Sequence, residues 1–129
     1  NIMKKITKDG IIHTIQIVPI SVVMVNEDFK IIPMNYNFEL EILTQPGVEP
    51  TIGQMSPLDW FLRIFESPII VASENNTPEM IEFCSKMSYR TDDPVLFIEK
   101  LDTDYLLNSL FAIISQLLED GCELISIKL

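Results

Sequence analysis

The 129-residue sequence has little of what most catalytic and metal sites are built from: one histidine, two cysteines and four glycines. The glycine-rich phosphate-binding motifs G-x-x-x-x-G-K-[ST] and G-x-G-x-x-G are absent, and so is the hydrolase motif G-x-S-x-G. A single histidine excludes metal sites with several histidine ligands, and no D-x-[DN]-x-[DN]-G calcium loop occurs. We therefore expect a non-catalytic protein with no catalytic residues, no cofactor and no metal.

The two cysteines, Cys84 and Cys122, are far apart and form no C-x-x-C pair. This pattern is typical of small buried residues, not of a disulfide or a metal site, and it predicts a reducing compartment. No apolar run approaches the ~20 residues of a membrane helix. No secretory signal follows Met3, because lysines and Asp9 occupy the place of an apolar segment. We expect a cytoplasmic protein that does not enter a membrane.

Acidic charge is the most informative bulk property. Nineteen Asp and Glu face nine Lys and Arg, which gives a net charge of −10 at pH 7. Residues 1–26 carry three lysines and one acid, so the acidic excess lies in residues 27–129. Such a field repels phosphate backbones and anionic lipids, so we expect no direct nucleic-acid binding and no membrane binding. It attracts a basic protein partner, although net charge also keeps a small domain soluble.

The first half of the sequence predicts strands. Residues 11–18 are rich in β-branched side chains, and residues 21–25 resume an extended pattern after Pro19, which ends or bulges the first strand. Residues 34–42 alternate strictly between apolar and polar, which predicts a strand that covers a core on one side only. Its apolar face comprises Met34, Tyr36, Phe38, Leu40 and Ile42.

The second half predicts helices. Ser56-Pro57 and Thr77-Pro78 each combine a helix-capping residue with a proline at the first helical position. Residues 102–120 predict the longest helix, whose eight Leu, Ile and Phe residues span an arc of roughly 160°. Burial between the sheet and other helices explains this wide arc, and so does a homodimer seam. Short apolar runs between the helices and the alternating residues 122–129 predict further strands.

Strands come first along the chain and then alternate with helices, which predicts an α+β fold. We expect one mainly antiparallel sheet with about three helices packed on one face, in a single domain of residues 3–129. Asn1 and Ile2 precede Met3 and are interpreted as a remnant of expression.

His13 is the natural candidate for a general base, because only histidine has an unperturbed pKa near neutrality. Its strand position places it in one row with Ile11, Ile15 and Ile17. This row predicts a buried structural histidine without a catalytic role.

Four acids and one aromatic residue are candidates for partner binding. Glu39 and Glu41 share the polar face of the 34–42 strand, which is interpreted as a solvated face or as an acidic contact surface. Asp92 and Asp93 lie in a loop where no helix cap explains them. Trp60 is interpreted as a core residue or as an aromatic anchor, because tryptophan is enriched at interface hot spots.

Small size, acidic charge and the absence of catalytic motifs favour a non-catalytic binding protein. Our leading hypothesis is a bacterial immunity or antitoxin-type protein that neutralises a basic toxin, for instance a nuclease, by direct binding. One alternative is a small acidic chaperone for secreted effectors, with a homodimer seam along helix 102–120. A third hypothesis is an enzyme with an unrecognised site around His13.

Overall fold

The computed structural model describes residues 2–65, 69–73, 77–87, 95–98 and 102–129. Eight strands and three helices occur in these ranges, and they confirm the predicted α+β class. Among the described helices, none combines the length and apolarity that crossing a bilayer requires. The elements are β1 (Ile2–Thr7), β2 (Gly10–Gln16), β3 (Ile20–Val25), β4 (Ile31–Tyr36), β5 (Glu39–Thr44), α1 (Pro57–Ile64), β6 (Ile69–Ser73), α2 (Pro78–Met87), β7 (Val95–Ile98), α3 (Thr103–Leu117) and β8 (Cys122–Lys128).

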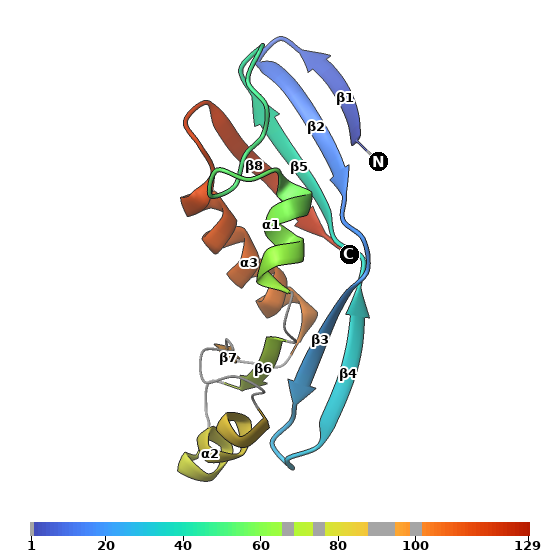
Figure 1. Ribbon diagram of the computed structural model, residues 1–129. Coiled ribbons are helices and arrows are strands. Elements are labelled where there is room, and N and C mark those ends of the chain that lie inside the picture. The colour runs from blue at the N-terminus through green and yellow to red at the C-terminus, as the bar shows by residue number, and fades with distance from the viewer. Residues whose placement is uncertain (1, 66–68, 74–76, 88–94, 99–101) are drawn as a thin grey trace.

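Two four-stranded sheets share one long ribbon (Figure 1). The first sheet has the strand order β1-β2-β5-β8 with antiparallel neighbours throughout, and the second has the order β4-β3-β6-β7. β2 runs on into β3, and β4 runs on into β5, so the ribbon of these four strands passes from one sheet to the other. The sequence predicted one sheet, and this shared ribbon explains how its strands divide between two.

The ribbon passes from one sheet to the other where the β2–β3 side has one residue more than the β4–β5 side. Ile15 lies opposite Leu40 in the first sheet, and Ile20 lies opposite Tyr36 in the second. The step from Ile15 to Ile20 is therefore one residue longer than the step from Tyr36 to Leu40. Pro19 lies within the longer side and has no N–H group to donate to a ladder. The predicted interruption at Pro19 is therefore confirmed, and it marks the boundary between the sheets.

The second sheet contains the parallel pairings of the fold. β6 pairs in parallel with both β3 and β7, and α2 connects β6 to β7 as the crossover that parallel neighbours require. Met80 and Cys84 of α2 pack with Val25 and Ala72 in a small core of their own. The expected packing of about three helices on one face of one sheet is not confirmed, because α2 packs with the second sheet.

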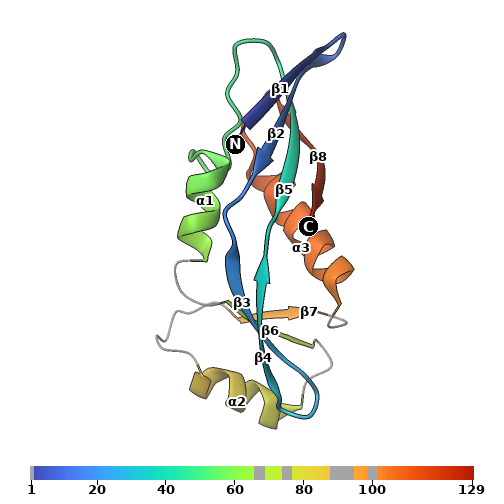
Figure 2. The same cartoon turned by 90° about the vertical axis from the view of Figure 1, so that its right-hand side faces the viewer.

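The helices begin where the sequence predicted. The Ser56 hydroxyl accepts the Asp59 N–H at 3.2 Å, and the Asp102 carboxylate accepts the N–H groups of Asp104 and Tyr105 at 2.8 and 3.2 Å. These bonds satisfy backbone donors that a first helical turn leaves without a partner. Figures 1 and 2 show α1 and α3 on the same side of the first sheet.

The third helix ends earlier than its sequence predicted. It stops at Leu117, because Leu118 adopts an extended conformation and forms a bridge with Ile52 of the long loop before α1. Gly121, which directly follows the predicted helix, has a φ of 85° in the turn that leads into β8, a conformation that glycine adopts without a steric penalty.

One large core joins the first sheet to α1, α3 and the second sheet. The residues that the second sheet contributes come from β3 and β4 and are Ile20, Val22, Met24 and Tyr36. The apolar face predicted for residues 34–42 is buried from Tyr36 onward, whereas Met34 is exposed. β1 was not predicted. It includes Ile2, which pairs with Ile15, so this residue takes part in the first sheet.

Candidate functional site

Glu39 and Glu41 lie on the outer face of the first sheet, opposite the core-facing Leu40. Lys128 forms an ion pair with Glu39 at 3.1 Å, and the Ser126 hydroxyl donates to Glu41 at 2.9 Å. The hydrogen bond to Glu39 and the charges of both glutamates raise the pKa of Lys128. The two acids therefore share the predicted face, but a neighbouring lysine already offsets part of their charge.

The other sequence candidates lie elsewhere. Asp92 and Asp93 fall outside the described residues. Trp60 is 4% exposed in the main core, where its ring packs edge-on against Phe61 with centroids 5.1 Å apart. This position agrees with the interpretation of Trp60 as a core residue.

The turn between β3 and β4 presents acids beside an aromatic ring, a combination that the sequence did not reveal. Glu27 and Asp28 are exposed there, and the Asn26 side chain accepts the Asp28 N–H at 2.9 Å. Phe29 has a φ of 61°, is 41% exposed and meets Phe83 of α2 edge-on, with ring centroids 5.3 Å apart. The tip of the ribbon is thus an ordered acidic turn with a partly exposed aromatic side chain.

β4 exposes apolar side chains on both of its faces. Ile31, Ile32 and Met34 are 50%, 39% and 36% exposed. Two features of the sequence indicate an exposed edge strand at this position. The adjacent isoleucines break the apolar-polar alternation, and Pro33 is typical of an edge strand.

The wide apolar arc of α3 is partly buried in the main core and partly exposed. Leu106, Leu110 and Ile114 belong to the main core. The sequence between Tyr105 and Leu118 contains no Asp, Glu, Lys or Arg, so the exposed face there is uncharged. The exposed large apolar residues of α3 are Phe111, Ile113 and Leu117.

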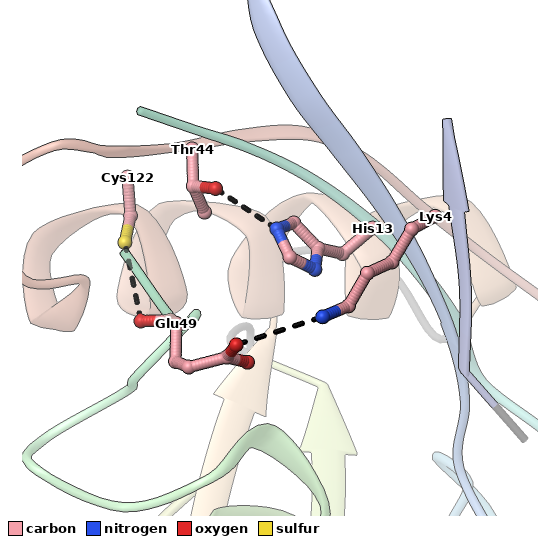
Figure 3. A network of polar contacts seen from close by, with 5 residues as sticks. All are labelled: Lys4, His13, Thr44, Glu49 and Cys122. Atoms are coloured by element: carbon pink, nitrogen blue, oxygen red, sulfur yellow. Dashed lines mark hydrogen bonds and ion pairs between the residues drawn. The ribbon is translucent and has the colours of Figure 1, made fainter. Parts of the chain in front are cut away.

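His13 is 2% exposed on the core side of β2, as its row of isoleucines predicted. Figure 3 shows its ring beside Thr44 and Lys4. The Nε2 atom lies 2.8 Å from the Thr44 hydroxyl, and the buried Nδ1 atom has no hydrogen-bond partner among the described residues. A neutral ring fits this setting, because a protonated one would present a buried N–H donor without an acceptor.

Charges around the ring reinforce this neutral state. Burial lowers the pKa of His13 below its ordinary value, the Lys4 ammonium lowers it further, and the Glu49 carboxylate opposes these effects. Lys4 and Glu49 form an ion pair at 3.5 Å next to the ring (Figure 3). Burial and the Lys4 charge therefore favour the neutral ring of His13.

Metal and small-molecule sites gain little support from the described part of the chain. No three His, Cys, Asp or Glu side chains within it converge as metal ligands. A surface hollow of about 390 Å³ lies beside the β1–β2 turn, lined by residues 6–11 with Gln45 and Pro46. His13 is not part of that lining, so this hollow does not give the histidine access to a ligand.

The chain was compared with protein-family models, with curated proteins and with solved structures, and none of these comparisons gave a significant match.

Proposed function

We propose that this chain is a non-catalytic, acidic binding protein that docks on a basic protein and neutralises it. Within that class, a bacterial immunity or antitoxin-type protein that acts in the cytoplasm on a basic toxin fits best. The chain combines small size, strong acidity and no recognised catalytic motif.

The observation that carries this proposal is the acidic surface. None of the described Asp and Glu residues is buried, so their charge faces solvent or a partner. Ion pairs with lysines involve Glu39, Glu49 and Glu82. The whole chain keeps a net charge of −10, and such a field speeds the encounter with a cationic surface.

Capture followed by kinetics tests this proposal. The purified chain is used at low salt to capture proteins from an extract of its source cells, and the bound protein is identified and purified. We expect a basic protein whose activity is lost when the chain is added in equal amount. Its association rate should fall as salt rises, because the Debye length shrinks from ~10 Å at 0.1 M to ~3 Å at 1 M.

Two results would contradict the proposal. One is that no basic protein is recovered. The other is an association rate that does not depend on salt, because charge steering would then play no part in the encounter.

A small dimeric chaperone for secreted effectors is the second candidate. The observation that favours it is the uncharged outer surface of α3, where Phe111, Ile113 and Leu117 are exposed. Cores of protein interfaces are depleted of charge in the same way. An inhibitor can act as a monomer, whereas this chaperone requires a stable dimer. Sedimentation equilibrium of the purified chain therefore separates the two candidates.

A further inference from the structure

Among the described strands, only β8 lies along the outer edge of the long ribbon, and it follows the β5 half of that edge. β8 pairs with β5 from Thr44 to Glu39 and ends at Lys128, next to the point where β5 meets β4. Among the described strands, β4 has β3 as its one neighbour. Figure 1 shows β4 at the outer margin of the molecule, beyond the C-terminal end of β8. An extended segment could therefore continue along β4 in the direction that β8 takes along β5.

The backbone groups that face this edge follow from the turn. The Asn26 N–H donates to the Lys30 carbonyl at 3.1 Å, so these two residues form a hydrogen-bonded pair. Hydrogen-bonded and non-hydrogen-bonded pairs alternate along an antiparallel ladder. Ile31, Pro33 and Asn35 therefore direct their backbone groups away from β3. The edge offers three carbonyl acceptors but only two N–H donors, because Pro33 has none.

Exposed side chains make this edge suitable for a strand. Natural proteins commonly protect edge strands with charged residues or proline, and residues 31–36 of β4 contain Pro33 but no charged residue. Ile31 projects to one face of β4, and Ile32 and Met34, which are partly exposed, project to the other. A segment paired with β4 would bury apolar side chains together with its backbone groups, as in recognition by strand addition.

A second copy of the chain is a poor occupant of this edge. A two-fold pairing centred on Pro33 would place two prolines opposite each other, and neither has an N–H group to donate. Two copies would also bring together two chains of charge −10. The turn at the tip of the same ribbon exposes Glu27 and Asp28 against one lysine, Lys30, and this acidic excess favours a cationic segment.

We propose that the edge of β4 binds an extended segment of the basic partner as an added strand. This inference rests on the proposed function, because the acidic character of the chain selects the partner. Ile31 and Asn35 supply the two backbone donors, and Pro33 limits which register the segment can adopt. The acidic tip meets basic residues of the segment.

The probe is a nine-residue peptide of alternating lysine and valine with blocked ends, added to the full chain at concentrations up to the millimolar range. Hydrogen exchange measured by NMR reports on single amides. We expect the Ile31 and Asn35 amides to become protected at least tenfold when the peptide binds. The same peptide with glutamate in place of lysine should give no protection.

Two variants, the first with a matched control, test the backbone contact and the side-chain contact. Asn35→Pro removes an outward donor without touching the inward ladder, and we expect affinity for the lysine peptide to fall at least tenfold. Asn35→Ala keeps the donor and should bind within about twofold of the wild type. Met34→Lys changes an exposed side chain, so it tests the edge if Asn35→Pro fails to fold. It should also weaken binding at least tenfold.

Several outcomes would overturn the inference. Binding that Asn35→Pro and Met34→Lys leave unchanged would place the contact elsewhere while the proposed function stands. No protection at millimolar peptide would exclude the edge as a binding site. Protection of Ile31 and Asn35 in the chain alone, lost on dilution, would identify a second copy as the occupant. Failure of the proposed function would instead appear as the absence of any captured basic protein.

Discussion

β4 and β5 are consecutive strands of one ribbon, yet their side chains are exposed to very different extents. Every second residue of β5 is buried, whereas β4 is exposed at all positions except Tyr36. β4 is nevertheless the more apolar strand. β5 lies between β2 and β8 with the main core on one face, whereas β3 is the one described strand beside β4. The burial of a side chain in this ribbon therefore depends on neighbouring strands and helices, and not on the composition of its strand alone.

The largest expected effect on stability comes from truncating a buried residue of β5, and the matched residue of β4 serves as its comparison. Leu40 of β5 is fully buried, so Leu40→Ala should lower the free energy of unfolding by about 2–5 kcal/mol. Met34 occupies the same face on β4 but is exposed, so Met34→Ala should cost less than about 1 kcal/mol. Urea denaturation at pH 7 measures both. Equal losses would show that β4 is as well packed as β5.

The same contrast exists within α3. Leu110 belongs to the main core, so Leu110→Ala should cost about 2–5 kcal/mol. Leu117 belongs to the same apolar arc, but its side chain is 41% exposed, so Leu117→Ala should cost less than about 1 kcal/mol. Thermal unfolding and sedimentation are measured together. A Leu117→Ala variant that mainly weakens dimerisation would favour the chaperone candidate.

A pH titration tests the core around His13. The folded pKa lies below the unfolded value of ~6.5, so the unfolded state binds more protons between the two values. Stability should therefore be complete above pH 6.5 and decrease as pH falls toward the folded pKa, with a slope of at most about 1.4 kcal/mol per pH unit. Urea denaturation from pH 8 to pH 5 measures this slope.

Two variants isolate the contribution of the histidine. His13→Gln cannot titrate in this range, so its stability should vary less with pH than that of the wild type. Lys4→Met removes the cation that lowers the pKa of His13, so it should reduce the slope, while Glu49 remains to favour the charged ring. An unchanged slope in His13→Gln would assign the pH dependence to other groups.

The smallest effects on stability should come from surface acids at the tip of the ribbon and near its middle, where β4 meets β5. Reversing Glu27 and Asp28 to lysine should change the free energy of unfolding by no more than about 0.5 kcal/mol. Reversing Glu39 and Glu41 should cost slightly more, because the ion pair of Glu39 with Lys128 and the hydrogen bond from Ser126 to Glu41 are lost. Both pairs of changes should slow association with the basic partner at low salt, and less so at high salt.

The comparison of these two reversed pairs distinguishes docking from solubility. If the contact lies along β4, the Glu27 and Asp28 variant should lose more affinity than the Glu39 and Glu41 variant, measured by association and dissociation rates. If both variants bind like the wild type at low salt, the acids serve only to keep the chain soluble.

Local signals predicted most elements of this fold. The capping residues Ser56 and Asp102 form the bonds that their positions indicate, and Pro19 interrupts the ribbon because it lacks an N–H group. The burial of His13 also followed from its row of isoleucines. These features depend on residues close together in the sequence, which is why they could be predicted.

The candidate contact surface was harder to predict. Glu39 and Glu41 lie on the expected face, but the offsetting lysine comes from the far end of the chain. The exposed edge of β4 could not be predicted, because it depends on where β8 ends relative to β5. Similarly, the bridge from Leu118 to Ile52 ends α3 early through a contact distant in sequence.

The sequence by itself determined the α+β class, the positions of most strands and helices, and the strongly acidic character of the chain. Alternation, capping residues and charge are local or additive properties, so no knowledge of neighbours was needed. Only the tertiary structure decided that the strands form two sheets, that β4 is left at an edge and that α3 is half covered. These features depend on which distant segments meet, because a side chain is buried only when another part of the chain covers it.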